Sequence, residues 1–248
     1  MRKQLQAFWL GLALTAVAFT ARAEELLKPF VLAYKTGGSM EVVVKEVKQK
    51  LTDGGFEIVG AYSPYETATI IAITNDALKQ AAAKSDFGGY GAAQRVSVTD
   101  VDNELQVAYT NPVYMAAGYR MKGDLKGVAD QLAKVLGNKQ QFGPAEGMTA
   151  EDLAEYHYMF GMEYFDEPSE LAQYDSYEKG VETIEKNLAE GVSGVTKVYR
   201  IDIPGKKQTV FGVAMEGGEK RKFQDDEFIM SEIDFKPLRS TAHLPYEI

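Results

Sequence analysis

The sequence contains no cysteine, two histidines (His157 and His243) and a single tryptophan, Trp9. Without cysteine, the chain cannot form disulfides, thiolate metal sites, haem attachments through sulfur or a lipoprotein anchor. Two histidines are too few for a three-histidine zinc site. Stability must therefore come from a packed core, and a hydrophobic content of 45% can supply one.

The first 23 residues have the order of a cleavable secretory signal. Met1-Arg2-Lys3 is a positive start, an apolar run covers 7–19, and Ala21-Arg22-Ala23 is a small-x-small cleavage site. The apolar run is shorter than the roughly 20 residues that a membrane anchor needs. No Arg-Arg pair is present, which favours the general export route. We therefore expect cleavage after Ala23 and a periplasmic location.

The rest of the chain is acidic. Three of the 27 Lys and Arg residues lie in the predicted signal, so 24 bases face 36 acids after residue 23, a net charge of −12. Such a surface repels phosphate backbones and anionic lipid headgroups, which argues against nucleic-acid and membrane-surface partners. No later apolar run is long enough to span a membrane, so we expect a protein that is not membrane-embedded after cleavage.

The hydrophobic pattern of the first half predicts alternating strands and helices. Ser39 is a suitable N-cap for an amphipathic helix that ends near Gly54. The expected elements follow the order β-α-β-β-α-β-β: strand 30–35, helix 40–51, strands 56–62 and 67–74, helix 76–84, and strands 94–101 and 104–109.

The second half predicts more helix. Its expected elements are a strand over 113–121, helices over 124–136, 149–165 and 176–190, a hairpin of strands 195–203 and 208–215, and a final strand within 238–248. The fold class is then α+β, with a first lobe at 25–118 and a second at 119–248 that carries a helical insertion at 124–165.

The two halves share a pattern at an offset of 137 residues. Both copies have a Ser-capped helix followed by two strands that a proline-containing turn connects. The matched residues are Ser39 with Ser176, Glu41 with Glu178, Val44 with Val181, Val47 with Ile184, Leu51 with Leu188, Gly54 with Gly191 and Tyr62 with Tyr199. The pattern predicts an internal duplication, although any capped amphipathic helix that ends in glycine would match in part.

Three stretches of the first half resemble the domain-of-unknown-function family 302. They are Leu51–Phe56, the strand pair that ends at Asn75, and the Arg95–Tyr109 hairpin. The resemblance covers roughly 28–120 and, more weakly, 176–248. It implies the β-α-β-β-α-β-β order and no established activity, so it supplies no catalytic residues. Family members often have Pro-Cys where Ala92-Ala93 stand here, so no role for that cysteine transfers.

The segment 156–165 is unusual because it places a histidine and two methionines among five aromatic residues. In a chain without cysteine, histidine and methionine are the remaining soft ligands, suited to copper or to the axial positions of haem. We therefore consider a metal site of His157, Met159 and Met162. On one straight helix His157 would lie about 200° from Met159, so another element would have to contribute. The alternative is a core helix whose methionines fill gaps.

Aromatic and methionine side chains also gather near the junction of the expected lobes, where ligand sites are common. The leading hypothesis is a non-enzymatic ligand-binding or accessory protein of the periplasm. Its site would comprise Tyr109, Tyr114, Met115, Tyr156 and His157.

Other functions remain open at this point. Gly88–Gly91 with Arg95 could cradle an anion, although it lacks the features of a P-loop. A hydrolase could use His157, but no nucleophile elbow is present. The acidic run over 151–170 could bind a hard cation, but its spacing fits no EF-hand loop and is more typical of a solvated helix face. A further alternative is an interaction module that docks a membrane or electron-transfer partner through the acidic face of the protein.

Overall fold

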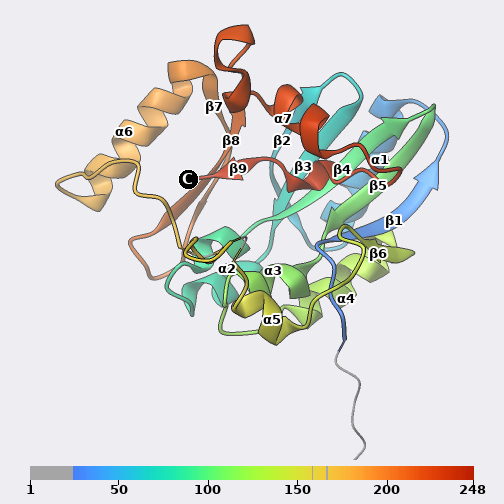
Figure 1. The fold of residues 1–248 in the computed structure, drawn as a ribbon, viewed down its shortest axis with the longest axis horizontal. Helices are drawn as coiled ribbons and strands as arrows, with labels where there is room; N and C mark the ends of the chain where they lie inside the picture. Colours follow the sequence, from blue (N-terminus) through green and yellow to red (C-terminus); the bar gives the residue numbers. More distant parts are fainter. Residues whose placement is uncertain (1–24, 158, 166) are drawn as a thin grey trace, which may run out of the picture.

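The computed structural model describes residues 25–248 except positions 158 and 166. The predicted signal sequence, Met1 to Ala23, lies outside the described residues. Most of the described chain folds into two antiparallel sheets with helices packed against them (Figure 1). The mixture of helix and strand confirms the predicted α+β class.

The larger sheet has six strands in the order β2-β3-β4-β5-β1-β6, and every neighbouring pair is antiparallel. Five of its strands come from the predicted β-α-β-β-α-β-β half, and β6 adds an edge beside β1. The bounds are β1 Phe30–Thr36, β2 Glu57–Tyr65, β3 Ala68–Thr74, β4 Gln94–Val101, β5 Glu104–Thr110 and β6 Gln140–Phe142.

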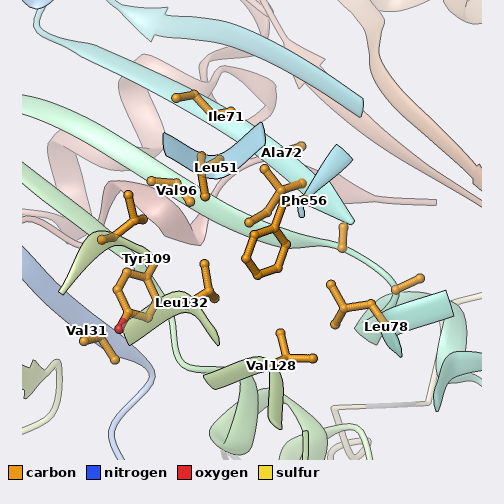
Figure 2. Close-up of a cluster of buried hydrophobic side chains, with 14 of the residues drawn as sticks. Val31, Leu51, Phe56, Ile71, Ala72, Leu78, Val96, Tyr109, Val128 and Leu132 are labelled. Carbon is orange, nitrogen blue, oxygen red and sulfur yellow. The ribbon is translucent and has the colours of Figure 1, made fainter. Parts of the chain in front are cut away.

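One face of this sheet packs against helices α1, α2 and α4, which enclose the main apolar core (Figure 2). Helix α1 begins at the Ser39 cap, whose hydroxyl accepts from Val42 N, and its buried side chains recur at helical spacing. A Cβ on Gly54 would lie 2.3 Å from Val135 Cγ2, so glycine lets α4 approach the end of α1. The helices are α1 Met40–Asp53, α2 Asp76–Ala83 and α4 Lys126–Leu136.

The opposite face of the sheet is crossed by residues 226–247, which we call the C-terminal segment. It contains helix α7 (Asp226–Ile233), the 3-10 helix η4 (Thr241–His243) and strand β9 (Tyr246–Glu247). Polar contacts attach it to the sheet: Tyr62 Oη donates to Asp226 Oδ2 over 3.0 Å, and Thr99 Oγ1 donates to Thr241 Oγ1 over 2.9 Å. Small apolar clusters around Phe30 and Ile70 complete the contact.

The smaller sheet has the order β7-β8-β9, again antiparallel, and packs between helix α6 and the larger sheet. Phe211 and Val213 of β8 face α6, whereas Val210 joins the main core. Gly60 of β2 allows β7 to approach closely, because a Cβ there would lie 2.1 Å from the carbonyl oxygen of Val198. The bounds are α6 Tyr177–Ala189, β7 Val195–Asp202 and β8 Thr209–Met215.

Two sequence predictions were wrong in the segment of the chain between β5 and α6. The expected strand 113–121 is instead helix α3 (Pro112–Gly118), because the Asn111 side chain accepts from Val113 N and proline occupies the first turn. The expected helix 149–165 ends early, as α5 (Ala150–Ala154). Only Leu153 of α5 is buried, and Gly161 has φ 83°, so the sequence beyond α5 has neither the packing nor the backbone conformation of a helix.

The order α6-β7-β8-α7-β9 matches α1-β2-β3-α2-β4, and each set of three strands pairs in sequence order. Element order does not by itself confirm an internal duplication. The duplication and the lobe boundary at 118/119 therefore stay predictions.

Candidate functional site

A cavity of about 630 Å³ opens where the C-terminal segment passes the first residues of β1 and β4. Helix α3 and the loop 144–148 form its other walls. Its lining is rich in aromatic residues, which include Phe30, Tyr90, Tyr114, Tyr119, Tyr156, Phe165 and Tyr246. A mostly apolar, concave site of this size suits a small organic molecule.

A buried ion pair forms the polar part of the cavity wall. Arg95 of β4 and Glu247 of β9 both line the cavity, and Arg95 Nη1 lies 3.1 Å from Glu247 Oε1. Their side chains are only 7% and 6% exposed. The Tyr199 hydroxyl of β7 donates to the same carboxylate oxygen, and the Tyr119 side chain is hydrogen-bonded to Arg95. The pair therefore joins the two sheets to α3.

The ion pair does not use every donor of the guanidinium group. Arg95 Nε is buried and has no hydrogen-bond partner among the residues that the structure describes. An unpaired buried N–H group costs about 1–3 kcal/mol, whereas a ligand atom that accepts from it would remove that cost. Less than 1 Å² of Arg95 Nε is accessible, so a ligand acceptor reaches it only if the side chains that enclose it move.

The surroundings raise the pKa of both residues, which favours the charged form of Arg95 but disfavours the charged form of Glu247. Burial opposes the charged form of Arg95, but Glu247 beside it keeps its pKa above the ordinary value, so the guanidinium stays positive. Burial raises the pKa of Glu247, and Arg95 and the Tyr199 hydroxyl partly offset this. Burial also raises the pKa of Tyr119 and of Tyr199, so both hydroxyls remain protonated.

His243 of η4 lines the same cavity. The residue as a whole is exposed, but partial desolvation of its ring against the cavity wall, and then the positive charge of Arg95, lower the pKa of His243 to about 4. Its Nε2 atom lies 3.4 Å from the Tyr246 hydroxyl, and the two rings meet edge to face. His243 is consequently a neutral, polar wall residue at neutral pH.

The structure brings together three of the five predicted ligand residues. Tyr114, Met115 and Tyr156 line the cavity. Tyr109 instead lies in the main core, where its hydroxyl donates to the Gly137 carbonyl over 3.0 Å. His157 is outside the lining: its Nδ1 donates to the Met162 carbonyl, and its ring lies 3.9 Å from that of Tyr164.

The predicted metal residues lie on an exposed turn. Met159 is 69% exposed and Met162 is 42% exposed, and Met162 N donates to the Met159 carbonyl over 3.1 Å. Within the described part of the chain, no three His, Asp or Glu side chains are grouped so as to hold a metal ion. Binding of copper or haem by His157, Met159 and Met162 stays a prediction.

The Arg95–Glu247 pair was not predicted from the sequence. One signal was present, because Arg95, Ser97 and Thr99 alternate with valines along β4 and mark a polar face. It could not be interpreted without knowing that the C-terminal segment covers this face. Glu247 carries no sequence signal, since nothing local distinguishes it from the other acids.

Among the described residues, no helix has the length and apolar character needed to cross a membrane. No protein-family model and no curated protein matches the chain. Among solved structures, the chain is similar to an uncharacterized conserved protein DUF302 from Bacillus stearothermophilus. That match covers 42% of this chain and 94% of that chain, with a TM-score of 0.37 and 14% sequence identity.

Proposed function

We propose that this is an exported, periplasmic protein that binds a small organic molecule in the cavity beside Arg95. The ligand has an apolar, aromatic body and a neutral hydrogen-bond acceptor such as a carbonyl oxygen. The observation that carries the proposal is a cavity rich in aromatic residues that is lined by Arg95, a residue whose enclosed Nε–H group has no partner among the described residues. Export is supported by the signal-like order of Met1 to Ala23.

The charge balance of the pair favours a neutral acceptor over a second anion. Glu247 already lies against the guanidinium, so a ligand carboxylate would approach a like charge as well as Arg95. A carbonyl oxygen can accept from the Nε–H group without that repulsion. Aromatic walls supply the remaining affinity through apolar burial and ring contacts.

The geometry supports binding more directly than catalysis. Arg95 and Glu247 are paired with each other, Tyr119 and Tyr199 stay protonated, and His243 is neutral. These groups can hold a polar atom in place. This arrangement supports a role in binding and retaining a ligand.

N-benzylacetamide is a suitable probe because it combines one aromatic ring with one amide. We expect it to bind the protein that starts at Glu24, with an affinity measurable by NMR titration. Replacing the pair with Arg95→Gln/Glu247→Gln removes the guanidinium but leaves a neutral, polar pair. It should weaken probe binding about tenfold or more, because a hydrogen bond from a charged donor is lost.

The matched control makes the same chemical change at a more exposed ion pair. Arg200 Nη1 lies 3.1 Å from Glu185 Oε1, and neither residue lines the cavity. Arg200→Gln/Glu185→Gln should bind the probe as the wild type does. Equal affinity in the wild type and in the folded Arg95→Gln/Glu247→Gln variant would refute the proposed site.

A further inference from the structure

The aromatic side chains of the cavity come from several different parts of its wall. They extend from β1, from α3 and its C-cap, from the segment after α5 and from the C-terminal segment, namely Phe30, Tyr114, Tyr119, Tyr156, Phe165 and Tyr246. Some of the rings contact one another: Tyr156 and Phe165 stack with their centroids 5.6 Å apart, and Tyr90 packs on Tyr119 at 5.8 Å. A ligand group inside the cavity therefore has aromatic side chains on more than one side.

The charged groups of the lining leave one negative charge without a counter-ion. Arg95 and Glu247 lie 3.1 Å apart and neutralise each other, and His243 is neutral at neutral pH. Glu146, on the loop 144–148, lines the cavity and is exposed, which places it at the opening. It forms no ion pair with the residues that the structure describes, since the ammonium group of Lys28 donates to the Ala145 carbonyl over 2.8 Å instead.

We propose that the ligand of this cavity carries a quaternary ammonium group, and that Glu146 selects for its positive charge. This inference rests on the proposed function, to which it adds the charge of the ligand. Aromatic rings attract a cation through the negative potential of their faces, and the attraction is strongest where water is excluded. A quaternary ammonium group has no N–H bond, so it needs no hydrogen-bond acceptor from the aromatic walls.

Two features favour a cation over a neutral or negative group. Glu146 attracts a cation and repels an anion at the opening of the cavity. The 24 bases and 36 acids after residue 23 give a net charge of −12, which raises the concentration of cations near the protein. The positive charge of Arg95 does not oppose this selection, because Glu247 lies against it.

The test uses two probes that share the N-benzylacetamide core and differ in one group at the para position of the ring. One probe carries trimethylammonium, and the other carries tert-butyl, which has the same shape and no charge. In an apolar cavity without charge selection, the tert-butyl probe would bind more tightly, because the ammonium group would lose its hydration. We expect the reverse: the cationic probe should bind the wild type at least about tenfold more tightly in an NMR titration.

Glu146→Gln tests the residue that selects the charge. It should weaken binding of the cationic probe about threefold or more, and it should leave the affinity for the tert-butyl probe unchanged. Glu151→Gln is the matched control, because Glu151 is an exposed acid of α5 outside the cavity lining and its loss changes the net charge by the same amount. This control should bind both probes as the wild type does. Both positions are exposed, so both variants should fold.

The possible results separate this inference from the proposed function. If the tert-butyl probe binds as tightly as the cationic probe or more tightly, or if Glu146→Gln and Glu151→Gln behave alike, this inference is refuted. The proposed function then stands on the binding of N-benzylacetamide. If N-benzylacetamide also fails to bind the wild type, the proposed function fails as well.

Discussion

The two faces of strand β4 are both buried, yet they are covered in different ways. Val96 and Val98 face the helices and belong to the main apolar core. Arg95 and Thr99 face the C-terminal segment and are bound to it through Glu247 and Thr241. The helix-covered face is held mainly by apolar packing, whereas the other face is held by polar contacts that have specific partners. A ligand site can form on such a polar face without disturbing the main core.

The largest effect should follow from breaking the buried pair. Arg95→Met leaves Glu247 buried without its counter-ion, so we expect the free energy of unfolding to fall by about 3–5 kcal/mol. Arg95→Met/Glu247→Met removes both charges and should recover most of that loss. Urea unfolding of the wild type and both variants measures this. If the double variant is no more stable than the single one, the pair is not the origin of the loss.

The opposite face should respond to loss of packing. Leu51 of α1 is fully buried in the main core, and Leu51→Ala should lower the free energy of unfolding by about 2–5 kcal/mol through the cavity that it leaves. Because the core lies on the other side of β4, the affinity for N-benzylacetamide should not change. A variant that remains folded but loses probe affinity would show that the two faces are coupled.

A smaller effect is expected where the C-terminal segment meets β4. Thr99→Val keeps the side-chain shape but removes the hydroxyl that donates to Thr241. Thr241 retains contacts to Tyr65 and Asp234, so the loss in unfolding free energy should be about 1 kcal/mol. Thermal unfolding checks this value, with Thr69→Val as the control, since the partly buried Thr69 of β3 bonds to Ser63 and does not contact the C-terminal segment through its hydroxyl. Equal losses in both variants would contradict the assignment.

The first half of the fold could be predicted because its elements carry local signals. The Ser39 cap, the helical spacing of Val43, Val47 and Leu51, and the alternation in the strands indicate the same structure. Helix α3 was predicted to be a strand because Val113 and Tyr114 are residue types that favour strands. The Asn111 cap, which indicates a helix, was not recognised. The Arg95–Glu247 contact joins residues 152 positions apart, and no local pattern predicts such a pairing.

The smallest effect should be a pH dependence that involves His243. The pKa of His243 is lowered to about 4 in the folded protein, against an ordinary value of 6.5, so the unfolded chain takes up a proton first as the pH falls. Stability from the neutral imidazole is present above about pH 6.5 and is lost as the pH falls towards 4.

The His243→Gln variant isolates this contribution. Urea unfolding at about pH 7 and about pH 4.5 should show a smaller loss of stability in His243→Gln than in the wild type. Asp226 and Asp234 also have raised pKa values, but they are present in both proteins and cancel in the comparison. An equal or larger loss in the variant would contradict the assigned shift.

The most direct test of the account observes the Arg95 Nε–H group itself. In the wild-type protein, its side-chain NMR resonance should shift during titration with N-benzylacetamide and saturate at the same concentration as the overall binding curve. The Nε–H resonance of Arg200, which lies outside the cavity, should stay in place. Binding that leaves the Arg95 resonance unmoved would contradict the claim that this guanidinium holds the ligand.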